Sequence, residues 1–271
     1  MGTFSVVNNI ASLEANRYLS LTQISLNSTL AKLSSGYRIN KSGDDAAGLA
    51  VANSYRTQVS VFSQGERNAN EGLSRLQIVD SGINNISLLL DRMSTLAAQS
   101  ASGTFQGSRT TLNAEFTQIR TEIDREATAA GMQTGGTFLG QQSVFVGGPS
   151  GTTVVSFNNS QPVDSAGLAI GALDISTVAG AQTAVTTLAT ALATAGTAQG
   201  TIGSAENRLG FAISLVKSQI TNTQAAEGII RDANFALESS NLAKYSILSQ
   251  SGIASLAQSN AAAANVLALL R

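Results

Sequence analysis

The chain has 271 residues, of which 16 are basic and 17 acidic, and it contains no histidine, cysteine or tryptophan. Without histidine and cysteine it lacks the commonest general base, the thiolate nucleophile and the best soft-metal ligands, which excludes most enzyme classes. Charges of the two signs nearly cancel, and no basic stripe could follow a phosphate backbone, so we expect no nucleic-acid binding. We also expect no catalytic residue, no metal and no cofactor.

The first arm of the chain, residues 1 to 35, has apolar side chains over a broad helical face. It opens without a basic segment or an unbroken apolar stretch, so we expect no cleaved secretory signal. The positions proposed to lie in a packed core are Leu13, Leu26, Leu30 and Leu33.

The stretch SSGYRINKSGDDAAGLAVA, residues 34 to 52, resembles a ligand loop but fits neither common type. A phosphate loop places a lysine after its glycines, whereas here Asp44 and Asp45 would repel the anion. A calcium loop needs oxygen ligands at alternate residues and a closing glutamate, which are missing. The stretch is better interpreted as a connector between two helices.

In this connector Gly36 is expected to end the first helix, and Asp44 and Asp45 to favour the start of the second through its dipole. Asn40 belongs to the same turn. Arg38, with Lys41, is a candidate for contacts between neighbouring copies of the chain.

Residues 44 to 100 have apolar side chains at alternating steps of three and four, typical of a long amphipathic helix of the coiled-coil kind. At about 1.5 Å per residue it would extend on the order of 80 Å, longer than a compact domain of this size is wide. We therefore expect an elongated rod. The predicted buried stripe is Tyr55, Val59, Phe62, Ala69, Leu73, Leu76, Ile83, Leu90 and Ala97, with Val79, Ile86 and Met93 beside it.

Three further elements are predicted before the last arm. A helix over 108–130 begins at Ser108, a favourable N-cap residue. Two β-branched runs around a Gly-Gly-Pro-Ser-Gly turn predict a β-hairpin over 142–157, within an irregular region of about 137–176. A helix over 177–221 follows, in which Gly196, Gly200 and Gly203 cost roughly 1 kcal/mol each unless close packing offsets them.

The last arm repeats apolar and small residues at heptad spacing, which indicates tight packing against several partners. Its segment 253–270 contains too many polar residues for a membrane span, so we expect no membrane insertion. If the two arms paired only with each other, most of their apolar surface would remain in water. We therefore expect them to fold on assembly, with neighbouring copies as the cover. The proposed core positions are Leu242, Tyr245, Leu256, Val266 and Leu270.

Two blocks at each end of the chain resemble bacterial flagellin: LSSGYRINKSGDDAAGLAVA and NANEGLSRLQIVDSGINNIS, then GSAENRL and the stretch from Ile229 to Arg271. The resemblance implies a mainly α fold with paired terminal helices, an inner coiled-coil domain of 1–42 with 232–271, and a rod domain of 43–231. About 40 residues remain for the hairpin and any outer elaboration, so a minimal form without large outer domains is expected.

The resemblance also implies a function and partners. Such a chain leaves the bacterial cell unfolded through the flagellar type III export apparatus and assembles into the extracellular filament used for motility. Its partners would be other copies of itself, the cap protein, the hook–filament junction protein and an export chaperone on the C-terminal arm. A junction protein is the alternative reading.

The rod of many flagellins is detected by an innate immune receptor. The matching positions here are Arg92, Leu96 and Glu115. Detected members tend to carry arginine and glutamate where this chain has Ser94 and Thr95.

Overall fold

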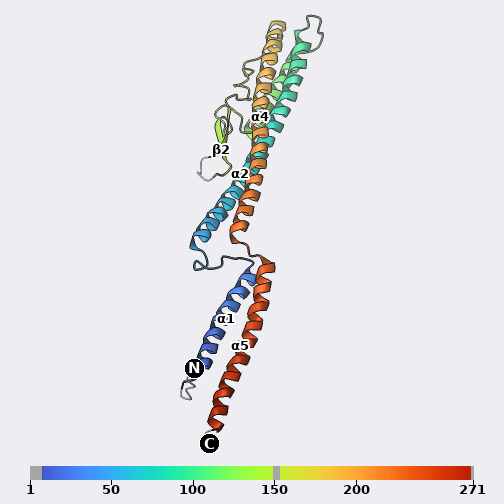
Figure 1. Ribbon diagram of the computed structural model, residues 1–271. Helices are drawn as coiled ribbons and strands as arrows, with labels where there is room; N and C mark the ends of the chain where they lie inside the picture. The colour runs from blue at the N-terminus through green and yellow to red at the C-terminus, as the bar shows by residue number, and fades with distance from the viewer. Residues whose placement is uncertain (1–7, 149–152, 270–271) are drawn as a thin grey trace. The chain divides into compact units, whose positions relative to one another are not determined.

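The computed structural model describes residues 8–148 and 153–269 (Figure 1). The mainly helical fold with one small hairpin is confirmed. Its elements in chain order are α1 (Ile10–Ser35), α2 (Ala46–Ala101), α3 (Arg109–Ala129), β1 (Gly140–Phe145), β2 (Val154–Asn159), α4 (Val178–Arg231) and α5 (Phe235–Leu269). Within the described residues, no helix combines the length and the hydropathy that a membrane crossing requires.

The chain forms two compact units. The terminal unit contains the described residues up to Thr57 and from Thr223 onward, and the central unit is Gln58–Asn222. Both divisions fall within helices, α2 and α4, whereas the resemblance to flagellin placed the domain limits near 42 and 232.

In the terminal unit, α1 and α5 pack side by side and antiparallel, which confirms the expected pairing (Figure 1). Near one end Asn9 Nδ2 donates to the Ser259 carbonyl at 2.9 Å, and near the other Lys32 Nζ lies 3.9 Å from Glu238 Oε1. Gly36 ends α1 as expected: its φ of 76° is left-handed, and its N–H donates to the Lys32 carbonyl.

In the central unit, α2 and α4 run antiparallel and share one hydrophobic core with α3 and the hairpin (Figure 1). Ser108 caps α3 as predicted, because its side chain accepts from the Thr111 N–H. Most of the predicted α2 stripe is buried in this core; the α2 residues in it are Phe62, Ala69, Leu76, Val79, Ile83, Ile86, Leu90, Met93, Leu96 and Ala97.

Helix α4 differs from the prediction in two respects. It continues past residue 221 to Arg231, because Ala225, Ala226 and Glu227 are strong helix formers. Gly196, Gly200 and Gly203 do not allow close packing, since a Cβ on any of them would meet open space. Alanines form the close contacts instead: Ala181, Ala184, Ala191, Ala195, Ala198 and Ala205 are all buried.

The hairpin is antiparallel, with Gly140 opposite Asn159 and Phe145 opposite Val154. It is held on α2 and α4 by side chains that reach its backbone. Asn68 Nδ2 donates to the Phe145 carbonyl at 3.1 Å, and Arg208 Nη1 donates to the Ser156 carbonyl at 2.7 Å.

Candidate assembly surface

The α1–α5 pair buries almost no apolar side chain in a single copy. Among the described side chains of these two helices, the buried ones are Thr29 and Glu238. A soluble single chain rarely leaves so much apolar surface in water. The large apolar side chains exposed on the pair are Ile10, Leu13, Tyr18, Leu21, Ile24, Leu30, Phe235, Leu237, Ile247, Leu248 and Ile253.

The predicted core residues occupy two kinds of position on this pair. Leu13 and Leu30 are 66% and 46% exposed, so they are open to a further partner. Five others are half-buried: Leu26, Leu33, Leu242, Tyr245 and Leu256. The side chain of Val266 and the whole of Leu270 lie outside the part of the chain that is described.

The connector is tied to the junction between α4 and α5. Tyr37 forms an antiparallel bridge with Asp232, and Arg38 N donates to the Arg231 carbonyl at 2.6 Å. Arg38 Nη2 also donates to the Ile230 carbonyl at 2.6 Å. The Arg231 guanidinium lies 4.1 Å from the centre of the Tyr37 ring, a cation–π contact. These Arg38 contacts are within one copy, and its role between copies stays a prediction.

The two aspartates of the connector have different tasks. Asp45 Oδ1 accepts from the Gly48 N–H at 2.8 Å, so Asp45 caps α2 as an N-cap residue. Asp44 Oδ2 accepts from the N–H groups of Lys41 and Asn40 within the connector, and its expected effect on the dipole of α2 stays a prediction. These two hydrogen bonds lower the pKa of Asp44, and the bond from the Lys41 N–H has the larger effect.

The three expected receptor positions lie in the central unit but are not equally accessible. Arg92 Nη2 pairs with Glu115 Oε1 at 2.6 Å, which joins α2 to α3 on the surface. Leu96 is 2% exposed and belongs to the core, so no protein partner could touch it in this conformation.

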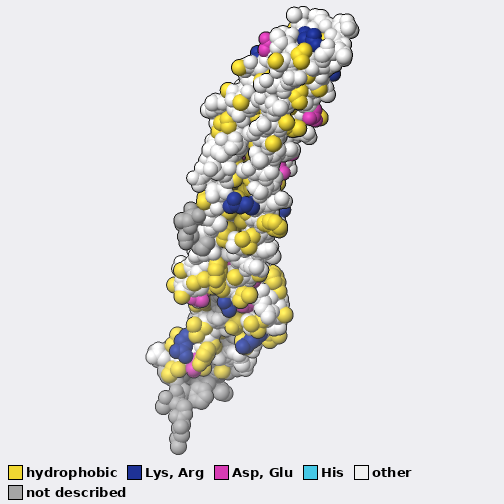
Figure 2. Space-filling model, turned by 90° about the horizontal axis from the view of Figure 1, so that it is seen from above, with side chains coloured by type: hydrophobic (Ala, Val, Ile, Leu, Met, Phe, Trp, Pro, Cys, Tyr) yellow, Lys and Arg dark blue, Asp and Glu magenta, His cyan; other side chains and the backbone are white. Residues whose placement is uncertain are grey.

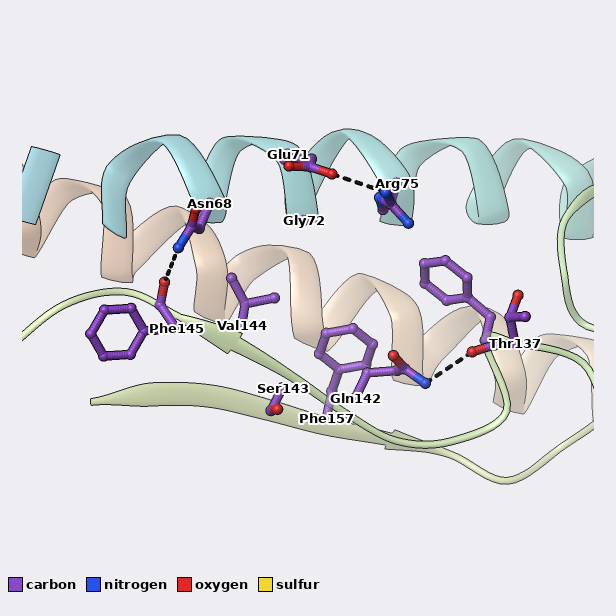
Figure 3. A pocket seen from close by; sticks show the side chains of 11 residues that line it. Asn68, Glu71, Gly72, Arg75, Thr137, Gln142, Ser143, Val144, Phe145 and Phe157 are labelled. Carbon is purple, nitrogen blue, oxygen red and sulfur yellow. Dashed lines mark hydrogen bonds and ion pairs between the residues drawn. The ribbon is translucent and has the colours of Figure 1, made fainter. Parts of the chain in front are cut away.

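A pocket of about 340 Å³ opens between α2 and the hairpin (Figure 3). Asn68, Glu71, Gly72 and Arg75 line it from α2, where Glu71 and Arg75 pair at 2.9 Å. The hairpin contributes residues 142–145 and Phe157. In the described part of the chain no group of acidic residues is arranged to hold a metal ion.

Figure 2 shows hydrophobic side chains spread over the visible face with charged ones in small groups. Comparison with known proteins identifies the family of the chain. Residues 6–135 match the bacterial flagellin N-terminal helical region, and residues 183–270 match the bacterial flagellin C-terminal helical region. The chain belongs to the bacterial flagellin family. It is thus a non-enzymatic, structural protein of the flagellar filament, located in the extracellular or periplasmic flagellum.

Two curated relatives match this flagellin over nearly its whole length, and one solved structure matches part of it. The flagellar filament 33 kDa core protein of Treponema phagedenis is 32% identical over 97% of this chain and 99% of its own. The flagellin of Halalkalibacterium halodurans is 31% identical over 97% of this chain and 98% of its own. A crystal structure of Bacillus cereus flagellin is 30% identical, covers 59% of this chain and 94% of its own, and has a TM-score of 0.49. The expected minimal form, without large outer domains, is confirmed.

Sequence reasoning found the terminal arms but missed other contacts and exposed apolar side chains. The ties between Arg38 and the end of α4 had no signal, because they depend on how the connector folds back. The exposed Phe211 and Leu215 on α4 were also missed, since they alternate with buried apolar residues in the mostly apolar stretch LGFAISLV, residues 209–216.

Proposed function

We propose that this flagellin assembles into the filament through the apolar faces of α1 and α5, which other copies of the chain bury. The observation that carries the proposal is that, among the described side chains of these two helices, no apolar one is fully buried in the single copy. Burying one large aliphatic or aromatic side chain contributes roughly 1.5–3 kcal/mol. A few such contacts per copy are enough to drive association.

Assembly and folding are coupled in this proposal. An isolated helix pair whose described apolar side chains are at most half-buried gains little from packing, so α1 and α5 depend on neighbours for much of their stability. Terminal segments in particular fray unless they are docked. A chain without cysteine can also pass through the export apparatus unfolded, since no disulfide has to be formed or broken.

We propose that three other proteins also bind the apolar faces of α1 and α5. The cap protein would hold each arriving copy until α1 and α5 are covered, and the hook–filament junction protein would offer the first such surface. An export chaperone would cover the apolar residues of α5, such as Leu248 and Ile253, before export.

Seeded polymerisation followed by electron microscopy tests the proposal. Purified chain added to short filament fragments should extend them into long filaments. Extension that stops after a short segment would instead fit the alternative, a hook–filament junction protein. Failure to extend the seeds at all would contradict self-assembly through these helices.

A further inference from the structure

The chain leaves the helical path for three residues between α4, which ends at Arg231, and α5, which begins at Phe235. We call these residues, Asp232, Ala233 and Asn234, the α4–α5 break. The break contains neither proline nor glycine, the residues that most often interrupt a helix.

The local sequence gives no strong preference between a break and a continuous helix. Alanine is the best helix former, and aspartate and asparagine are intermediate. Asn234 favours the break as a cap of α5, since its Oδ1 accepts from the Leu237 N–H at 3.2 Å and its carbonyl from the Glu238 N–H at 2.9 Å. A break also has a cost, because Asn234, Phe235 and Ala236 precede the first hydrogen bond of α5 and their N–H groups have no helical acceptor. Tertiary contacts therefore decide the balance.

Those contacts come from the connector, through Gly36 and Arg38. Arg38 Nη2 donates to the Ile230 carbonyl and the Arg38 N–H donates to the Arg231 carbonyl, both at 2.6 Å. In the other direction, the Ala233 N–H donates to the Gly36 carbonyl at 2.9 Å. The connector thus supplies partners for backbone groups on both sides of the hydrogen-bond count.

The two carbonyl groups bound by Arg38 are groups that a continuous helix would use itself. In a helix each carbonyl accepts from the N–H four residues later. The Ile230 carbonyl would accept from Asn234, and the Arg231 carbonyl would accept from Phe235. Arg38 therefore replaces the two hydrogen bonds that the break removes.

The Ala233 N–H makes the two arrangements exclude each other. It donates to Gly36 when residues 36–38 are docked, whereas in a continuous helix it would donate to the Ile229 carbonyl. A single N–H in good geometry serves one of these acceptors. The population of each arrangement is therefore set by whether residues 36–38 are docked.

We infer that the α4–α5 break is conditional: docking of residues 36–38 holds it open, and without that contact α4 continues into α5 as one helix. The connector follows α1 and the break precedes α5, so this device couples the two terminal arms within one copy. It does not depend on which neighbours bury α1 and α5, and it goes beyond the proposed function.

Hydrogen exchange of single amides in the full-length, unassembled chain tests the inference. Tyr37→Ala combined with Arg38→Ala removes the ring that stacks on α4 and one side-chain hydrogen bond to the break. The N–H groups of residues 234–236 should then join the helix, and their exchange should slow by roughly tenfold or more. The 13Cα chemical shifts of residues 232–234 should move to helical values.

Two further variants control this result. Lys41→Ala is the matched control, because Lys41 lies in the same connector and its hydrogen bond to Asp44 is made by its backbone N–H. It should leave the exchange of residues 234–236 unchanged. Phe235→Pro fixes the break, because proline is favoured at the first position of a helix and disrupts a helix interior. Added to the double variant, it should restore the fast exchange of Ala236.

Two results would overturn the inference. The first is exchange of residues 234–236 in the double variant that is as fast as in the wild type or faster. The second is slow exchange of Ala236 that persists after Phe235→Pro, because a continuous helix could not be its cause. Arg38→Ala alone covers the case in which the double variant does not fold. It should slow the same amides to a smaller extent, and wild-type exchange in that variant would also count against the inference.

Discussion

Single carboxylates show how local surroundings decide what the same chemical group does in this flagellin. Asp44 is exposed and accepts two backbone hydrogen bonds, which favour its charged form and lower its pKa. Glu206 is half-buried, its Oε1 is buried without a hydrogen-bond partner, and its pKa is raised by burial and then by the charge of Asp80. The two groups therefore give opposite pH dependences.

Asp44 should stabilise the connector at neutral pH and lose that effect in acid. Because its folded pKa is lowered, its contribution is present above the ordinary value of 3.8 and is lost as the pH falls through the folded pKa. Asp44→Asn should therefore flatten the acid limb of the unfolding profile, measured by circular dichroism. Asp91→Asn is the control on the exposed side of α2. An identical acid limb in wild type and Asp44→Asn would contradict the role of this carboxylate.

The contribution of Glu206 to stability should have the opposite pH dependence. Because its folded pKa is raised, its contribution is fully present below the ordinary value of 4.5 and is lost as the pH rises through the folded pKa. Glu206→Gln keeps the shape, removes the repulsion from Asp80 and supplies a donor. We expect a higher Tm for the variant at pH 7 and a difference that shrinks toward pH 4. A Tm difference that is independent of pH would count against a charge effect.

The helices differ in how well their first and last residues can be predicted from the sequence. Helix bounds were predicted well where a cap residue coincides with the start or end of an apolar period, as at Gly36 and Ser108. The end of α4 was missed because no proline or cap residue marks it, and the polar stretch after 221 has no clear period. Exposure of Phe211 could not be predicted, since a mostly apolar stretch does not show which side meets the core.

Two glycines provide a matched test of what each position requires. A Cβ on Gly65 would collide with the carbonyl of Val146, so Gly65→Ala should loosen the hairpin from α2 and lower the Tm. A Cβ on Gly200 would meet nothing, so Gly200→Ala should stabilise α4 by about 1 kcal/mol. For a protein of this size that corresponds to roughly 2–4 °C in a thermal melt. A Tm that does not fall in Gly65→Ala would contradict the first assignment, and a Tm that does not rise in Gly200→Ala would contradict the second.

Leu242 and Leu256 test the packing of α5. Both are half-buried beside α1, and neighbouring copies should complete their burial in the filament. Leu242→Asp or Leu256→Asp would then bury an unpaired charge, at a cost of several kcal/mol, and should prevent seeded growth. Leu192→Asp, outside α1 and α5, is the control. Filaments of normal length and yield from either α5 variant would rule out this packing.

At the scale of the whole molecule, the terminal and central units differ in how much of a hydrophobic core each one forms in a single copy. The central unit has a continuous hydrophobic core, whereas the buried side chains in the described part of the α1–α5 pair, Thr29 and Glu238, are polar. The sequence already indicated this difference, because the arms carry apolar residues on too many sides for one partner to cover. It could not indicate which surfaces of neighbouring copies provide the cover.

Limited proteolysis should reveal the same difference. In the unassembled chain the first 40 residues should be cut much faster than the central unit, and in filaments both should resist, because neighbours cover α1 and α5. Digestion is followed by mass spectrometry of the fragments. Equal protection of residues 1–40 before and after assembly would argue that these helices are already stable alone.

The uncovered apolar faces of α1 and α5 also link two quantities that are usually treated as independent. The free energy that a copy gains by leaving solution is the same free energy that sets the lowest concentration at which filaments grow. Any substitution that makes the single chain more soluble by removing apolar surface from these helices must therefore raise that critical concentration. If α1 and α5 make the proposed contacts, a change in these helices that improves the solubility of the single chain should weaken filament growth by the same free energy.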